Sequence, residues 1–176
     1  MRVLDAGDIS LEPQTASHAD EMFVVLSDPA IYEYENEPPS SIEWLRERFA
    51  RLESRRSADG REQWLNWVIR LPSSELIGYV QATVRANGDA AIAYELSSAF
   101  WGRGYARQAV QAMMAELAKR YGVRNVTAVL KLRNERSRRF LERLGFSPAP
   151  PAMRLENDVP SDELLMYFSP LDRPES

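Results

Sequence analysis

The chain has 176 residues, of which 44% are hydrophobic and 27% are charged, and its formal net charge is −4. These values are typical of a soluble globular protein, and the length fits one domain with a core of its own. Cysteine is absent, which excludes disulfides, a cysteine nucleophile and thiolate metal sites, and without a membrane-length apolar run or a signal peptide we expect a cytoplasmic protein that does not bind membranes.

The first elements predicted along the chain are a short strand and a helix. Residues 9–13 form the strand, and the apolar spacing of residues 19–26 predicts the helix, with Thr15 or Ser17 as its N-cap. The only histidine, His18, lies at the start of this helix. A histidine metal site or a Ser-His-Asp triad would have to use it, and we expect a solvated surface residue instead.

An acidic and aromatic segment separates this helix from the next one. Residues 31–39 (IYEYENEPP) end in two prolines, and we expect an ordered loop there, not a strand. Apolar residues at helical spacing then predict a helix over residues 42–52. Ser40 and Glu43 have the spacing of a capping box at its start.

Three strands are predicted next, over residues 64–71, 75–85 and 91–96. Short turn signals at residues 72–74 and 87–89 separate them. The short connections predict an antiparallel meander.

Residues 94–107 (YELSSAFWGRGYAR) organise the second half of the chain. The last strand of the meander leads into this segment, and a helix predicted over residues 105–121 leaves it. Gly102 and Gly104 carry no Cβ, and the helix start offers free N–H groups and a positive dipole end, which together favour an anion. The same pattern also fits a plain tight turn, because a lone Gly-x-Gly is a weak signal.

The C-terminal part is predicted to continue as strand, helix and strand. Residues 125–132 alternate as a strand, Asn134 caps the helix that follows, and Gly145 ends that helix. A proline-rich turn over residues 148–151 precedes the last strand, residues 164–168.

Basic residues gather in residues 103–143, which hold 11 of the 22 lysines and arginines against 3 acidic residues, a local charge of +8. This excess indicates either solvated helix faces or a positive field for a polyanionic small ligand. We do not expect nucleic acid binding, because the chain as a whole is acidic and the basic segment lacks an aromatic stacking pattern.

Three short blocks follow one another along the chain: ELIG at residues 75–78, WGRGYARQA at 101–109, and N-x-x-S-x-x-x-L-x-x-L-G-F at 134–146. In this order and at these spacings they resemble the GCN5-related N-acetyltransferase (GNAT) superfamily, nearest to its branch of ribosomal-protein N-terminal acetyltransferases (RimJ/RimL-like). The resemblance covers about residues 8–170. It implies a single α/β (α+β) domain over residues 1–176, with a mixed, mostly antiparallel sheet of six to seven strands and about four flanking helices.

The resemblance also implies acetyl-CoA as the acetyl donor, with its pyrophosphate on the backbone N–H groups of the glycine loop. The strand before the loop would pair with the pantetheine arm, and the basic excess agrees with a ligand that carries three phosphates. Arg103 and Arg107 are the first candidates for phosphate contacts. The residues expected at the cofactor are Leu96, Ser97, Gly102, Arg103, Gly104, Tyr105, Ala106, Arg107, Asn134 and Ser137.

Acetyl transfer to a primary amine needs a base, because only the neutral amine has a free lone pair. Glu95 is best placed for this role, although it could instead pair with a neighbouring strand. A backbone N–H at or near Leu96 would stabilise the oxyanion, and no metal is required.

The chain departs from the family pattern at two positions. Ala99 stands where the loop often begins with Gln or Arg, and Phe140 stands where many members have a tyrosine that protonates the leaving thiolate. Phenylalanine cannot donate a proton, so Ser137 is the expected substitute. It is equally possible that Ser137 has no catalytic role and only forms a hydrogen bond with the backbone at the start of its helix.

The acceptor amine, a protein N-terminus or a small molecule, is expected to enter beside the first two helices. Tyr32, Tyr34 and Glu35 are the candidate contacts, and the acidic run around them could attract an ammonium group or only be a solvated charge run. No basic residue is assigned to this side, which argues against an acidic acceptor. The protein could act as a monomer or a homodimer.

Other functions remain as alternatives. Phe140 leaves open a non-catalytic module that binds acetyl-CoA and reports it to a partner. A nucleoside-triphosphate site is disfavoured because the loop lacks the Gly-Lys-Ser/Thr of a P-loop, and a dinucleotide fold is disfavoured because hairpin strands precede the loop.

Overall fold

The structure is a computed structural model that describes residues 1–34 and 36–169. The strands are β1 (Leu4–Asp5), β2 (Ser10–Pro13), β3 (Glu62–Arg70), β4 (Leu76–Arg85), β5 (Asp89–Leu96), β6 (Asn125–Lys131), β7 (Ser147–Pro148) and β8 (Glu163–Phe168). The α-helices are α1 (Ala19–Val25), α2 (Ile42–Leu52), α3 (Tyr105–Tyr121), α4 (Glu135–Arg143) and α5 (Pro151–Glu156), and the 3-10 helices are η1 (Ala16–His18), η2 (Pro29–Tyr32) and η3 (Ser98–Phe100).

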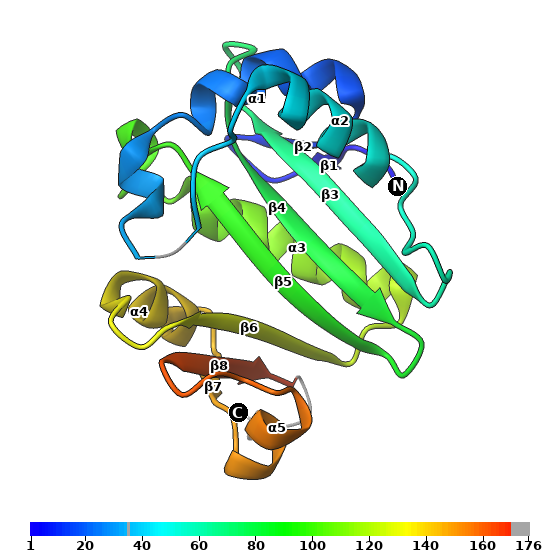
Figure 1. The fold of residues 1–176 in the computed structure, drawn as a ribbon, viewed down its shortest axis with the longest axis vertical. Coiled ribbons are helices and arrows are strands. Elements are labelled where there is room, and N and C mark those ends of the chain that lie inside the picture. The colour runs from blue at the N-terminus through cyan, green and yellow to red at the C-terminus, as the bar shows by residue number, and fades with distance from the viewer. Residues whose placement is uncertain (35, 170–176) are drawn as a thin grey trace.

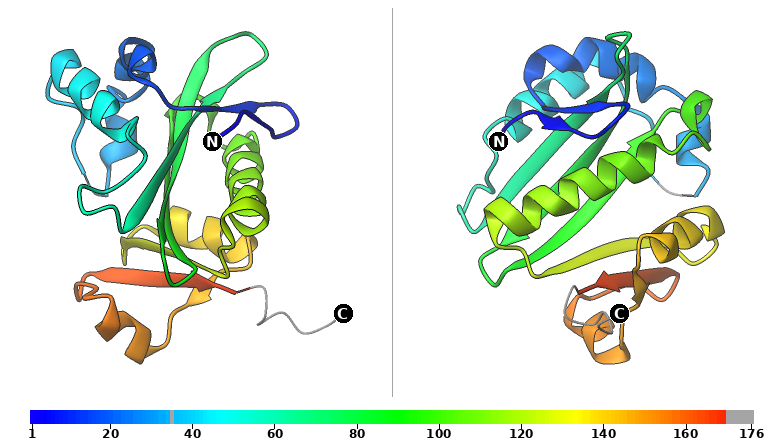
Figure 2. Two further views of the ribbon diagram at one scale, coloured as in Figure 1. Left: turned by 90° about the vertical axis from the view of Figure 1, so that its right-hand side faces the viewer. Right: turned by 180° about the vertical axis from the view of Figure 1, so that it is seen from behind.

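One mixed sheet forms the centre of the molecule, with the strand order β1-β2-β3-β4-β5-β6-β8-β7 (Figure 1). Neighbouring strands are antiparallel except β5 and β6, which are parallel. Helices α1 and α2 cover one face, and α3 covers the other (Figure 2). The predicted fold class is confirmed, and the described residues hold eight strands and five α-helices, slightly more than expected.

The strands of the meander present alternate residues to the two faces of the sheet. Leu65 and Trp67 of β3 belong to the larger core beneath α3, whereas Val68 belongs to a second core beneath α1 and α2. The register places Val68 opposite Tyr79, and Tyr79 opposite Glu95. Tyr79 and Glu95 therefore lie on the face that α1 and α2 cover.

Strands β5 and β6 are paired only at their beginning. Residues 89–91 lie beside residues 125–127, whereas β5 stays paired with β4 as far as Leu96. Beyond residue 91 the two strands diverge toward α4 (Figure 1). The pairing of β5 with β6 therefore ends at residue 91, and an extended ligand can pair with a strand edge.

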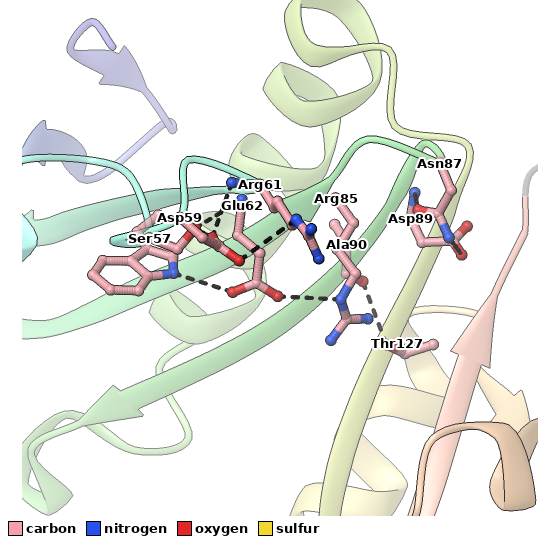
Figure 3. A network of polar contacts seen from close by, with 10 residues as sticks. Ser57, Asp59, Arg61, Glu62, Arg85, Asn87, Asp89, Ala90 and Thr127 are labelled. Carbon is pink, nitrogen blue, oxygen red and sulfur yellow. Dashed lines mark hydrogen bonds and ion pairs between the residues drawn. The ribbon is translucent and has the colours of Figure 1, made fainter.

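Polar side chains hold the opposite end of the meander (Figure 3). Glu62 Oε1 lies 3.4 Å from Arg85 Nε, and Glu62 Oε2 accepts a hydrogen bond from Trp64 Nε1 at 3.4 Å. Asp89 Oδ1 accepts a hydrogen bond from Asn125 Nδ2 at 2.8 Å, which fixes the start of the β5–β6 pair.

Two predictions at the helix starts are wrong. The N-cap of α2 is Ser41, not Ser40, and its Oγ accepts from the Trp44 N–H at 3.1 Å, because Ser41 is the residue directly before the first helical one. His18 is not solvated. Its side chain is only 15% exposed, and its Nδ1 accepts from the backbone N–H of Thr15, which is the N-cap of η1.

The segment predicted as a proline-rich turn continues into an unpredicted helix, α5. Pro151 is its first residue, a position at which proline is favoured because no N–H is needed there. In the part of the chain that the structure describes, no helix combines the length and apolar character needed to cross a membrane.

Glu116 of α3 is a buried carboxylate whose side chain is 2% exposed. Arg2 donates to both of its oxygens, at 3.1 Å from Nε to Oε1 and 2.8 Å from Nη2 to Oε2, and these bonds hold the pKa of Glu116 below its usual value. We expect Glu116→Gln to lower the free energy of unfolding by about 2 kcal/mol at neutral pH. Because the folded pKa is depressed, this contribution is complete above the unfolded pKa and is lost as pH falls through the folded pKa. Thermal unfolding from pH 7 to pH 3 checks this, since the two curves should converge on acidification.

Candidate active site

A cavity of about 1010 Å³ opens where β5 and β6 diverge. Its walls come from these two strands, from the glycine loop before α3, from α4, and from α2 with the segment that precedes it. This volume is at the upper end of that of ligand pockets. The cavity joins the predicted cofactor loop to the predicted acceptor side.

The glycine loop has the predicted order of strand, loop and helix. Gly102 and Gly104 have φ angles of 74° and 84°, and α3 begins directly after Gly104. Among the described residues, the backbone N–H groups of residues 102–107 have no acceptor, and the first paired one is that of Gln108, on the Gly104 carbonyl at 3.1 Å. A Cβ built on either glycine meets no atom within 4 Å. The N–H groups therefore face open space that suits an anion.

Of the four arginines in the cavity wall, α3 contributes Arg107 and α4 contributes Arg136 and Arg143. Only Arg107 was singled out from the sequence. The other two lie seven residues apart, which is about two helical turns and so one face of α4, and this spacing was the available signal. Arg103, the second predicted phosphate contact, lies against Phe100, with its guanidinium carbon 5.4 Å from the ring centroid.

The end of β5 presents backbone groups to the cavity. Ser97 donates its N–H to the Ile77 carbonyl of the β4 side at 2.9 Å. Successive peptide groups of a strand point in opposite directions, so the Leu96 N–H faces the gap beside β6. The Leu96 carbonyl accepts from Trp101 Nε1 at 2.8 Å. Leu96 thus has the geometry that the predicted oxyanion donor needs, whereas the Ser97 N–H is engaged by the sheet.

Glu95 lines the cavity from the α1/α2 face of the sheet. An added Cβ on Gly78 would clash with the Glu95 carbonyl oxygen, so glycine is needed for β4 to approach β5 this closely. Burial raises the pKa of Tyr32 to about 12, and the nearby carboxylates of Glu95 and Asp28 add to this effect. Within the described residues, no group of three or more His, Cys, Asp or Glu side chains is arranged to hold a metal ion.

Ser137 lies on the other side of β5, at the start of α4. Its N–H donates to Asn134 Oδ1 at 3.0 Å, which confirms Asn134 as the N-cap. Its Oγ lies 2.6 Å from Tyr94 Oη, and the Tyr94 and Phe140 ring centroids are 4.9 Å apart. Tyr94 therefore supplies a hydroxyl close to Phe140. Sequence reasoning missed this residue, although strand alternation already placed it on the face opposite Glu95.

The predicted acceptor contacts lie in different places. Tyr32 lines the cavity, and its hydroxyl donates to the Leu26 carbonyl at 2.7 Å. Tyr34 also lines it, but its carbonyl accepts from Arg133 Nη2 at 3.0 Å, and its ring centroid lies 5.8 Å from the Arg136 guanidinium carbon. Glu35 lies outside the described residues. The Tyr34 contacts join the segment before α2 to Arg133 and to Arg136 of α4.

Asp28 ties this loop to the segment before the glycine loop. Its Oδ2 accepts from the Ser98 N–H at 2.7 Å and its Oδ1 from the Ala30 N–H at 3.0 Å. Burial raises the pKa of the Asp28 carboxyl, but the hydrogen bonds from Ser98 and Ala30 outweigh it and hold the pKa below its usual value. Asp28 is therefore ionised at neutral pH and acts as a positioning residue for both loops.

We expect Asp28→Ala to weaken binding of the predicted ligand, acetyl-CoA, about 10-fold, the effect of losing a charged acceptor that orders the glycine loop. Titration calorimetry measures the change. Asp28→Asn keeps one acceptor oxygen and should restore most of the affinity. Equal weakening by both variants would contradict a role in accepting these hydrogen bonds.

The prediction that the acceptor side has no basic residue is wrong, because Arg48 of α2 lies there. It is half-buried and lines the cavity, and its guanidinium carbon lies 5.5 Å from the Trp44 ring centroid. Arg48 was not singled out from the sequence, because helical periodicity does not show how α2 sits on the sheet.

Comparisons with known proteins give a single family. The family model of the acetyltransferase (GNAT) domain matches residues 8–147. No curated protein matches the chain. The family prediction made from the three sequence blocks is confirmed.

Solved structures share the fold over nearly the whole chain. RimL, a ribosomal L7/L12 α-N-protein acetyltransferase in complex with coenzyme A, has a TM-score of 0.79 at 19% identity and covers 95% of this chain and 97% of its own. The ribosomal-protein-S5-alanine acetyltransferase from Vibrio fischeri has a TM-score of 0.77 at 18% identity, with 98% and 99% covered. A GNAT-family acetyltransferase from Bacillus anthracis has a TM-score of 0.74 at 16% identity, with 95% and 98% covered. These three structures show the same fold as this chain.

Proposed function

The chain belongs to the acetyltransferase (GNAT) domain family, and we propose that it transfers the acetyl group of acetyl-CoA to a primary amine. The acceptor is a protein N-terminus or a small-molecule amine. One observation carries the proposal: six backbone N–H groups at the glycine loop have no acceptor among the described residues, and this loop lines the same cavity as Glu95 and the edge of β5 that faces β6.

The described residues fit acetyl-CoA at both ends of the cavity. The N–H groups of residues 102–107 and the side chains of Arg107, Arg136 and Arg143 suit its phosphates. The edge of β5 that faces β6 suits the amide-containing pantetheine arm. When bound, the cofactor would supply an activated acetyl thioester, and Glu95 and Ser137, which line the same cavity, are the residues proposed to act in the reaction.

In the proposed mechanism, Glu95 takes a proton from the acceptor ammonium, directly or through water, which frees the nitrogen lone pair. The Leu96 N–H donates to the carbonyl oxygen as negative charge develops on it. The nitrogen–carbon bond forms, the carbon–sulfur bond breaks, and the nitrogen releases its second proton to solvent, from which the Ser137–Tyr94 pair recovers the proton that it gives to sulfur. Ser137 donates its hydroxyl proton to the leaving sulfur, and Tyr94 at 2.6 Å can donate to Ser137 in turn.

We expect Ser137→Ala to lower kcat about 10-fold with little effect on acetyl-CoA affinity, and Tyr94→Phe to cause a smaller loss in the same direction. A thiolate is a good leaving group, so the effect is smaller than for most general acids. Steady-state assays of CoA release measure both variants. Tyr167→Phe is the control, because its hydroxyl bonds Asn125 at 3.4 Å outside the cavity wall. Unchanged kcat in Ser137→Ala would remove Ser137 from the mechanism.

The second candidate is a non-catalytic module that binds acetyl-CoA, which Phe140 favours because the usual proton donor of the family is missing there. Both candidates require acetyl-CoA binding, so turnover separates them. Incubation with acetyl-CoA and a broad set of amines, with detection of free CoA, is the test. Release of CoA that depends on the amine supports the enzyme, and binding without release supports the module.

A further inference from the structure

The cavity has a second polar row beside Glu95. In the β3–β4–β5 register, Asn66 lies opposite Gln81, and Gln81 lies opposite Ala93. This row is two residues along from the Tyr79–Glu95 pair, on the same face and away from the glycine loop. Two residues of a strand span about 7 Å. A small acceptor can therefore reach Glu95 and this second row at the same time.

Asn66 is the residue of this row that most strongly indicates a bound ligand. It is only 8% exposed and lines the cavity, yet its side-chain amide has no hydrogen-bond partner among the described residues. No side-chain nitrogen or oxygen in that part of the chain is both fully buried and unpaired. The Asn66 amide must therefore reach the open space of the cavity, and a buried polar group in this position is expected to bond a ligand.

Arg48 brings a positive charge to the same region. Its guanidinium makes no ion pair with any described acidic residue, whereas Arg46 on the same helix lies 2.7 Å from Asp20. Burial and then the Glu95 carboxylate raise the pKa of Tyr79, and the Arg48 guanidinium opposes them, so both charges lie near this hydroxyl. A half-buried cation without an anion is costly to desolvate, and a ligand anion would offset that cost.

We propose that the acceptor amine carries a carboxylate, which Arg48 binds together with Asn66 and Gln81 while Glu95 receives the amine. The two ends of the acceptor site then hold opposite charges, which complement a zwitterion. This inference rests on the proposed acetyl transfer. The carboxylate belongs either to a free amino acid or to an acidic side chain at a peptide N-terminus, since both place it within a few bonds of the amine.

The test compares acceptors that carry this carboxylate with matched acceptors that carry an amide in its place. One arm uses free amino acids. It compares L-glutamate with its isostere L-glutamine for a side-chain carboxylate, and alanine with its α-amide for the α-carboxylate. The other arm uses Glu-Ala-Ala-amide against Gln-Ala-Ala-amide. We expect kcat/KM for the carboxylate member to exceed that of the amide member about 10- to 100-fold in at least one arm. The arm with the preference identifies the source of the carboxylate.

The variant Arg48→Gln should reduce this preference to about one by lowering kcat/KM for the carboxylate member. Arg46→Gln, on the same helix but at the surface, is the matched control and should keep the preference. Circular dichroism and acetyl-CoA titration confirm that both variants fold and bind the donor.

Each outcome bears on one of the two claims. Equal use of the two members in both arms, or a preference that survives Arg48→Gln, would overturn the carboxylate subsite while acetyl transfer stands. Turnover with amines that lack a carboxylate, such as spermidine, but with neither arm would overturn it as well. Failure to bind acetyl-CoA would count against the proposed function itself.

Discussion

Glu95→Gln is expected to lower kcat at least about 100-fold while leaving acetyl-CoA affinity within about twofold of wild type. The carboxamide keeps the size and the position in β5 but cannot accept a proton from the acceptor ammonium. The loss should be greatest near pH 7 and smaller at high pH, where the amine is already neutral. Steady-state rates of CoA release from pH 6.5 to 9.5, together with calorimetric titration of acetyl-CoA, measure both quantities.

Glu62→Gln is the matched control for this experiment. Glu62 is also a half-buried strand glutamate, but it pairs with Arg85 at the other end of the sheet and does not line the cavity (Figure 3). It should change stability slightly and kcat not at all. If Glu95→Gln were as active as Glu62→Gln, Glu95 would be a structural strand residue, and another group would have to deprotonate the amine.

Gly104→Val should weaken acetyl-CoA binding at least about 10-fold. The residue has a φ of 84° directly before α3, and the space around its missing Cβ is open toward the N–H groups that would hold the pyrophosphate. A valine there strains the backbone and places a branched side chain where a phosphate must approach.

Backbone strain alone could also weaken binding, and Gly60→Val isolates that effect. Gly60 has a φ of 70° and no atom within 4 Å of a built Cβ, but it lies outside the cavity wall. Both variants should lose similar thermal stability, and only Gly104→Val should lose affinity. Equal acetyl-CoA dissociation constants in the two would leave the glycine loop as a structural turn.

The backbone path around the site could be predicted from the sequence because its signals are local. Alternation and turn residues fixed the β3–β4–β5 meander, and the glycines with the apolar stripe of α3 fixed the strand–loop–helix order. Asn134 was identified as a cap because capping depends on neighbours only three residues away. The two errors, at the N-cap of α2 and at α5, are also local. Either serine of the pair 40–41 could be the N-cap, and the proline pair 150–151 fits both a turn and the start of a helix.

The contacts that complete the site could not be predicted, because they join residues far apart in the chain. Tyr94 forms a hydrogen bond with Ser137, 43 residues away in the sequence, and Asp28 forms one with Ser98, 70 residues away. The position of Arg48 in the cavity depends on how α2 is rotated over the sheet, which the periodicity of the helix alone does not determine. These are the residues on which binding and specificity are proposed to depend.

Calorimetric titration of the purified protein with acetyl-CoA, with ATP and NAD as control ligands, tests the central claim most directly. The proposed site predicts micromolar binding of acetyl-CoA and no comparable binding of the two controls, because only acetyl-CoA has a pantetheine arm for the edge of β5 that faces β6. Absence of acetyl-CoA binding, or equal binding of all three ligands, would contradict the proposed site.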